Sequence, residues 1–190
     1  EVVSSVRAAV DIPLYAKLSP NTTSIVIEAK AALDAGVDGL ALINTVSAIE
    51  VDPFAGRPII GNLLCGMSGP AIRPIAQRKV ADVALAMKRG EIATAPILGM
   101  GGISSGLDVA RFVMLGASAV QIGSALVWGD VDQFEKITTE LSKDFKSQLN
   151  IDYTYDPNLI AGLIIQVGSV MVDTSIKTKI KKLEKKMLEA

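Results

Sequence analysis

Short apolar runs alternate along the chain with longer stretches in which apolar residues recur every three or four positions. The short runs predict four strands, and the second of them is apolar on both faces, which is typical of a parallel strand covered on both sides. The predicted strands are residues 13–19, 39–44, 96–100 and 119–122.

Helical periodicity fills most of the intervals between these runs. One helix has Ile25 and Ala29 on its apolar stripe and stops at Gly36. Start and stop signals define the others, including a proline at the first helical position and an S-x-x-D capping box formed by Ser105 and Asp108. These later helices are predicted at 68–90, at 105–116 and from about Asp130 onward.

Residues 45–67 do not show a helical pattern. Two short strands, 49–52 and 57–60, are expected to turn at Pro53-Phe54-Ala55-Gly56, because proline and glycine mark turns.

A weak internal repeat indicates the fold class. Residues 36–44 resemble 116–124, and 13–19 resemble 96–102, so each repeat holds two strand–helix steps. Such repetition favours an α/β fold, a (β/α)8 TIM barrel to which this chain contributes about four units, with an open doubly wound sheet as the alternative. Four strands cannot close a barrel. We therefore expect an N-terminal half-barrel, either in an upstream segment or in a second chain, and an oligomer is expected.

Residues 151–190 differ from the repeats before them. An apolar segment at 159–172 is too short to span a bilayer, and Ile176, Ile180, Leu183 and Met187 form the stripe of a lysine-rich helix. We therefore divide the chain into a barrel half at 1–150 and a helical extension at 151–190 used for packing or oligomerisation. The alternative is a basic helix for a membrane surface or an acidic partner.

Composition narrows the classes of function. Of the 190 residues, 49% are hydrophobic and 21% are charged, which excludes a disordered chain. The net charge of −1 offers no field for nucleic acid. A single cysteine, Cys65, and no histidine exclude an internal disulfide, histidine-based catalysis and a Cys-rich zinc site, so no metal site is expected. We expect a cytoplasmic protein without a membrane span.

Two glycine-containing dipeptides end consecutive predicted strands. Gly101-Gly102 follows the strand at 96–100, and Gly123-Ser124 follows the strand at 119–122. In barrels, loops at these positions often bind phosphate through backbone N–H groups, and the helix that begins after Gly102 points its positive end at the same place. The pattern therefore predicts a phosphate site.

Polar side chains end the first two predicted strands. Lys17 lies within an apolar run, and an ammonium near the barrel mouth should meet an anion or a polarised carbonyl group. Asn44 and Thr45 could present amide and hydroxyl groups to a planar ligand, or they could only cap a turn.

Several motifs occur together in one order and spacing. They are Tyr15-Ala16-Lys17-Leu18-Ser19-Pro20-Asn21, Leu42-Ile43-Asn44-Thr45, Leu64-Cys65-Gly66-Met67-Ser68-Gly69-Pro70-Ala71-Ile72-Arg73-Pro74, Gly99-Met100-Gly101-Gly102-Ile103 and Gly116-Ala117-Ser118-Ala119-Val120-Gln121-Ile122-Gly123-Ser124. With them, residues 1–145 resemble the C-terminal half of class 1 dihydroorotate dehydrogenases, most closely class 1B.

This resemblance implies an FMN oxidoreductase that converts dihydroorotate to orotate in pyrimidine biosynthesis. Lys17 would contact the isoalloxazine ring and stabilise negative charge on the reduced flavin. The other roles implied by motif position are flavin lining for Ile43 and Gly69, phosphate binding for Gly101, Gly102, Gly123 and Ser124, and pyrimidine binding for Asn44 and Thr45.

The resemblance places no catalytic residue in this chain. The family's catalytic base belongs to the other half of the barrel, and Cys65 lies in a different loop. Class 1B also implies a partner subunit that carries FAD and an iron–sulfur cluster. Two alternatives stay open: a reductase like dihydropyrimidine dehydrogenase, or a non-catalytic half-barrel scaffold that binds phosphate.

Overall fold

Residues 1–149 and 150–190 form two separate compact units. The computed structural model describes residues 1–129, 132–145, 164–167 and 170–173.

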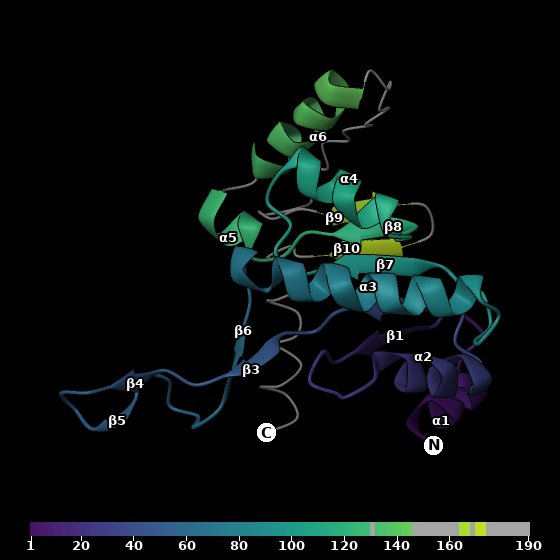
Figure 1. The fold of residues 1–190 in the computed structure, drawn as a ribbon, viewed down its shortest axis with the longest axis horizontal. Helices are drawn as coiled ribbons and strands as arrows, with labels where there is room; N and C mark the ends of the chain where they lie inside the picture. Colours follow the sequence, from purple (N-terminus) through teal and green to yellow (C-terminus); the bar gives the residue numbers. More distant parts are fainter. Residues whose placement is uncertain (130–131, 146–163, 168–169, 174–190) are drawn as a thin grey trace, which may run out of the picture. The chain divides into compact units, whose positions relative to one another are not determined.

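A parallel four-stranded sheet organises the first unit (Figure 1). Its strand order is β1-β2-β7-β8, so the β2-to-β7 connection is the longest one between neighbouring strands. All four predicted strands are confirmed, each shorter than the apolar run that indicated it. The strands are β1 Tyr15–Leu18, β2 Gly39–Leu42, β7 Ile97–Met100 and β8 Ala119–Gln121.

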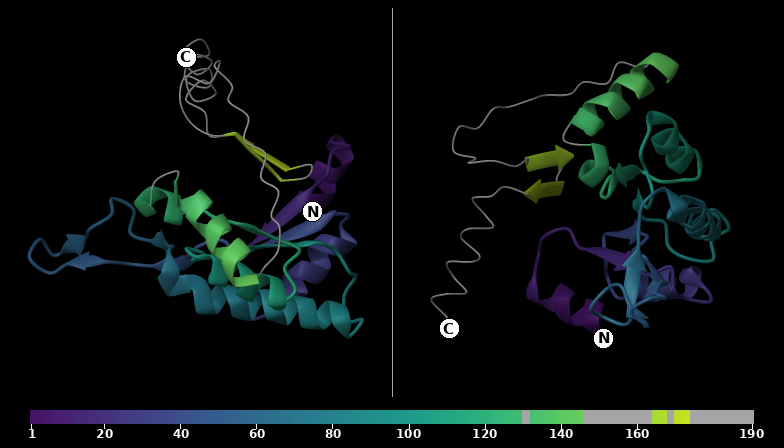
Figure 2. Two further views of the ribbon diagram at one scale, coloured as in Figure 1. Left: turned by 90° about the horizontal axis from the view of Figure 1, so that it is seen from above. Right: turned by 90° about the vertical axis from the view of Figure 1, so that its left-hand side faces the viewer.

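Three helices pack side by side along one face of this sheet (Figures 1 and 2). They are α2 Ile25–Asp34, α3 Arg73–Lys88 and α4 Gly106–Met114, and a 3-10 turn at Pro70–Ile72 leads into α3. Because each helix lies between two parallel strands in the sequence, the α/β class is confirmed. The connections also agree with four steps of a β/α barrel.

The hydrophobic core lies between the sheet and these helices. Leu40 and Leu42 of β2 and Phe112 of α4 are fully buried in it. Val80 and Val83 of α3 lie on the same side. Alternate residues of the strands contribute to this layer, so the opposite face of the sheet carries the remaining strand side chains.

Residues 46–67 form an arm of two antiparallel ribbons that extends away from the sheet (Figures 1 and 2). The outer ribbon pairs β4 Val51–Asp52 with β5 Arg57–Pro58, which confirms the predicted turn. The inner ribbon pairs β3 Val46–Ala48 with β6 Cys65–Met67 and was not predicted. It brings residues 68–70 back to the sheet.

Three further helices complete the first unit: α1 Val2–Ala9, α5 Ala125–Gly129 and α6 Asp132–Phe145. The sequence did not predict α1. Arg7 of this helix forms an ion pair with Asp38, with 2.9 Å between the guanidinium nitrogen and the carboxylate oxygen. The predicted last helix is confirmed as α6, and its apolar stripe buries Ile137. No helix in the described part of the chain is both long and apolar enough to cross a membrane.

The second unit contains a β-hairpin. Strand β9 Ile164–Val167 pairs antiparallel with β10 Val170–Asp173. The expected helical extension is therefore wrong for residues 164–167 and 170–173. These two short runs are rich in β-branched residues and are separated by Gly168-Ser169, a sequence pattern that favours a hairpin over a helix. The predicted helix from Ile176 to Met187 lies outside the described residues.

Candidate active site

The predicted site residues lie at or just after the carboxyl ends of the sheet strands or follow the arm. Lys17 lies near the end of β1, Ile43 follows β2, Gly101 follows β7 and Gly123 follows β8. Gly69 follows β6, which ends the arm. Because the four sheet strands are parallel, their carboxyl ends meet at one edge, where ligands of α/β proteins bind.

Glycine at 102 permits a close contact between two loops. Gly102 has a φ of +72°, and a Cβ built on it would lie 2.6 Å from the carbonyl oxygen of Gly69 and 2.9 Å from Cβ of Arg73. Gly69 itself is buried and has a φ of +88°. The loops after β6 and β7 therefore touch through their backbones, as a shared ligand site between them requires.

Gly101 packs toward α3 and the end of β2. A Cβ at Gly101 would lie 2.7 Å from Cβ of Ala76 and 3.5 Å from Cγ1 of Ile43. Its φ of +127° is also one that favours glycine. Packing against Ala76 accounts for a glycine here without a ligand, whereas the phosphate role predicted for Gly101 stays a prediction.

Open space lies beside Gly69 and Gly123. A Cβ at Gly123 would meet no atom within 4 Å, and a Cβ at Gly69 would meet only Oγ of Ser124, at 4.0 Å. None of the described residues accepts a hydrogen bond from the backbone N–H groups of Gly102, Gly123 or Ser124. Space next to N–H donors that are unpaired within the described residues is what a phosphate group needs.

Lys17 lies on the sheet face opposite the helices. The ring of Tyr15 covers Gly39 of the neighbouring strand, and Lys17, two residues further along β1, shares that face and pairs in register with Ala41. The Lys17 side chain is exposed. It thus faces the side that would form the interior of a closed barrel. Within the described residues, no hydrogen bond or ion pair joins it to the loops that contain Gly69, Gly102 and Gly123.

Backbone and side-chain hydrogen bonds fix the segment that carries Asn44 and Thr45. The Asn44 N–H donates to the Leu18 carbonyl at 2.9 Å, and the Asn44 side chain is exposed. The Thr45 side chain lies against Gly66 of β6. Asn21 donates to the Thr45 carbonyl at 3.1 Å and accepts from the Ser47 N–H at 2.8 Å, so it ties the β1 and β2 loops together.

Asp108 is the one buried charged residue in the described part of the chain. Its Oδ2 accepts from Arg73 at 2.9 Å and from the N–H and hydroxyl of Ser104 at 3.1 and 3.2 Å, and its Oδ1 accepts from Arg111 at 2.8 Å. Burial by itself raises the pKa of this carboxyl. The bonds from Ser104 and Ser105 and the two arginines outweigh burial, so the pKa lies below its ordinary value.

The lowered pKa of Asp108 predicts acid-sensitive stability. A carboxyl group whose pKa is lower in the folded state stabilises the fold above its unfolded pKa of about 3.9, and this contribution is lost as pH falls through the lowered value. We expect Asp108→Asn to cost about 1–3 kcal/mol of unfolding free energy at pH 7 and less near pH 2. Urea unfolding at both pH values measures the loss of unfolding free energy. An equal loss at pH 7 and near pH 2 would contradict the predicted acid sensitivity.

Sequence reasoning did not find the roles of Arg73, Asp108 or Asn21. The predicted capping box is confirmed in part: the Ser105 side chain accepts from the Asp108 N–H at 3.3 Å, whereas the Asp108 carboxylate accepts from the N–H of Ser104 rather than that of Ser105. One sequence signal did indicate that the Asp108 carboxylate has bonding partners. Asp108 lies four residues before Phe112, on the buried stripe of α4, where a carboxylate needs partners. No local signal indicated its bond to Arg73, 35 positions away.

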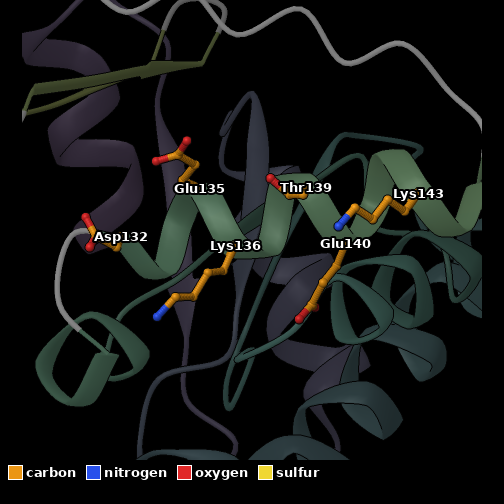
Figure 3. A pocket seen from close by; sticks show the side chains of 6 residues that line it. All are labelled: Asp132, Glu135, Lys136, Thr139, Glu140 and Lys143. Carbon is orange, nitrogen blue, oxygen red and sulfur yellow. The ribbon is translucent and has the colours of Figure 1, made fainter.

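A shallow hollow lies elsewhere, along α6 (Figure 3). Its lining residues are Asp132, Glu135, Lys136, Thr139, Glu140 and Lys143, all from this helix. Their side chains point in different directions rather than toward one centre, and Glu140 accepts from the Gly106 N–H at 2.8 Å. Mixed charges on one helix face are typical of a solvated surface, and no described residues form a cluster of metal ligands.

Comparison with known proteins identifies the family of the first unit. The family profile described as dihydroorotate dehydrogenase matches residues 1–145. The chain belongs to this family. The sequence-based resemblance is thereby confirmed, and membership of the family implies that the parallel sheet of the first unit is a portion of a TIM barrel.

Curated relatives agree on the class within the family. These similar proteins bear the name dihydroorotate dehydrogenase B (NAD(+)), catalytic subunit, and three of them illustrate the match. The protein of Methanocaldococcus jannaschii is 43% identical over 148 residues, covering 78% of this chain and 46% of the relative. That of Anoxybacillus flavithermus is 48% identical over 125 residues (66% and 38%), and that of Pyrococcus abyssi is 40% identical over 148 residues (78% and 48%). The chain thus spans less than half the length of these relatives.

A second family profile matches the C-terminal part of the chain. The profile described as ATP synthase delta (OSCP) subunit matches residues 119–187, which include the hairpin of β9 and β10. Residues 119–145 fall within both matches. The dihydroorotate dehydrogenase match ends before the second compact unit begins.

Proposed function

We propose that this chain is part of an FMN-dependent enzyme that oxidises dihydroorotate to orotate. One observation carries the proposal: in a member of the dihydroorotate dehydrogenase family, Gly102 and Ser124 lie against Gly69, and Ile43 lies against Gly101, at the carboxyl ends of the parallel strands. The names of the relatives support the same reaction.

The residues at this edge fit the cofactor. Backbone N–H groups of Gly102, Gly123 and Ser124 would bind its phosphate next to the open space at Gly69, with Gly101 beside them, and the buried Ile43 would line the ring. When bound, FMN would accept the hydride that dihydroorotate loses.

The polar side chains would orient the pyrimidine and supply charge. Asn44 and Thr45 would donate hydrogen bonds to the substrate from a segment whose backbone is already fixed by Leu18 and Asn21. Lys17 would supply a positive charge on the interior face of the barrel. The general base and the remaining half of the barrel would come from residues outside this chain.

An electron-transfer partner is also part of the proposal. The relatives are called catalytic subunits of an NAD(+) enzyme, which supports a second subunit and NAD+ as the final acceptor. An FAD and iron–sulfur cluster would belong to that partner, since this chain has a single cysteine.

The first experiment is to purify the full-length protein and measure its flavin spectrum and its turnover. We expect a yellow protein with FMN that oxidises dihydroorotate and not dihydrouracil. Preference for dihydrouracil would favour the reductase alternative. A colourless protein that still binds inorganic phosphate would favour the non-catalytic scaffold.

Replacing Lys17 by methionine tests its proposed charge. We expect kcat for dihydroorotate to fall about 10- to 100-fold, because a charge-assisted hydrogen bond contributes about 1.5–3 kcal/mol. Stopped-flow reduction of the flavin measures the effect. Lys30→Met is the matched control, since Lys30 is an exposed lysine of α2 paired with Asp34. Equal kcat values in the two variants would exclude a role for Lys17.

A second function is proposed for the C-terminal unit, as a module of the ATP synthase delta (OSCP) type on the same polypeptide. The profile match to residues 119–187 and the separate compactness of residues 150–190 support it. Intact-mass analysis of the native protein, with fragmentation from both ends, tests it. One polypeptide should carry both α3 and the hairpin of β9 and β10. If they always occur in separate polypeptides, the second function does not belong to this protein.

A further inference from the structure

An ion pair with one buried partner lies next to the two glycine loops, those of Gly69 and Gly102. Arg73 begins α3, four residues after Gly69, and Asp108 lies in the first turn of α4, six residues after Gly102. Their side chains meet at 2.9 Å, and Asp108 is 1% exposed whereas the Arg73 side chain is 30% exposed. The pair therefore joins the starts of the two helices that follow the two loops.

The same junction contains the tightest backbone approach at the site. A Cβ on Gly102 would lie 3.0 Å from the Arg73 nitrogen as well as 2.6 Å from the Gly69 oxygen. Asp108 also binds both the N–H and the hydroxyl of Ser104, two residues after Gly102. One carboxylate thus fixes the loop after β7 and, through Arg73, the loop after β6.

Positive groups surround the Asp108 carboxylate. Arg73 and Arg111 both donate to it, and the N-terminus of α3 adds the positive end of its helix dipole. The N-terminus of α4 is already occupied by a second carboxylate, because Glu140 accepts from the Gly106 N–H at 2.8 Å. Arg73 keeps further N–H groups beyond the one that bonds Asp108, and it is partly exposed. This environment favours a dianionic group over an uncharged one at the adjacent loops.

We propose that the Arg73–Asp108 pair is a positioning device for the phosphate end of the flavin site. It holds the loops of Gly69 and Gly102 at the separation that suits a phosphate, and it determines the preference for FMN over riboflavin, which lacks the phosphate. The inference rests on the proposed function. Neither residue is a catalytic residue.

The test compares two ligands on the flavin-free full-length protein. Fluorescence titration with FMN and with riboflavin gives two dissociation constants for the wild type and for Arg73→Met, Arg73→Lys and Asp108→Asn. Arg78→Met is the matched control, because Arg78 lies on the same helix in an exposed ion pair with Asp82. We expect Arg73→Met and Asp108→Asn to weaken FMN binding by about 10- to 100-fold and riboflavin binding by less than about threefold. Arg73→Lys should restore most of the preference.

The outcomes separate the two proposals. If FMN and riboflavin binding fall together, the pair has only a structural role and the inference is wrong. If both are unchanged while the wild type prefers FMN, the inference is wrong and the proposed function stands. If the wild type binds neither flavin, both are wrong. Should Asp108→Asn fail to fold, the comparison of Arg73→Met with Arg73→Lys still decides.

Discussion

Gly102→Ala should abolish detectable FMN binding and lower the unfolding free energy by more than about 3 kcal/mol. The φ of +72° costs an alanine about 1–2 kcal/mol. The new Cβ would also lie 2.6 Å from the Gly69 carbonyl oxygen, which is backbone and cannot rotate away. Relief of this contact requires the loops after β6 and β7 to separate, and this movement would displace the Gly102 N–H that is proposed to bind the phosphate. Urea unfolding and FMN titration measure the two effects.

Gly123→Ala is the matched control for this substitution. A Cβ at Gly123 meets no atom within 4 Å, so we expect its unfolding free energy to stay within about 0.5 kcal/mol of the wild type. The methyl group would still enter the space proposed for the phosphate, and FMN binding should weaken. Wild-type FMN affinity in Gly123→Ala would remove Gly123 from the proposed site, and wild-type stability in Gly102→Ala would contradict the strain argument.

The sheet and its helices could be predicted because local patterns determine them. Each of the four strands is a short apolar run, and Gly36, Gly90 and Gly116 end the helices where the pattern breaks. Strand ends in a parallel sheet necessarily share one edge, so the position proposed for the site follows from the strand positions, whereas the ligand at that edge stays a prediction.

The inner ribbon of the arm could not be predicted in the same way. Strands β3 and β6 are three residues each and contain Ser47 and Gly66, so neither has an apolar run. Their pairing depends on a contact between residues about twenty positions apart, such as Val46 with Met67. The hairpin of β9 and β10, by contrast, had a local sequence signal. Gly168-Ser169 between two β-branched runs is a turn signal, but the apolar character of the segment obscured it.

The Arg73–Asp108 ion pair shows a further limit of prediction from the sequence. The spacing of Ser105 and Asp108 predicted a helix cap, and that bond is present. The carboxylate itself is used by Arg73, whose position in space depends on the whole arm returning residues 68–73 to the sheet. Sequence patterns locate backbone elements, whereas partners of a buried charge follow from tertiary packing.

Phe112→Ala should lower the unfolding free energy by about 3–5 kcal/mol. Phe112 is completely buried in α4, and its ring contacts the position where Gly99 of β7 lacks a side chain. Loss of the ring leaves a cavity between α4 and β7 that the rigid sheet cannot close. Because β7 leads into Gly101 and Gly102, FMN affinity should fall together with stability.

Two variants make this expectation testable even if the alanine variant does not fold. Phe112→Leu removes less volume and should cost about 1–2 kcal/mol. Val113→Ala is the matched control on the same helix, since Val113 is 51% exposed and should cost less than about 0.5 kcal/mol. Equal costs for Phe112→Leu and Val113→Ala would mean that α4 does not pack on β7 through Phe112.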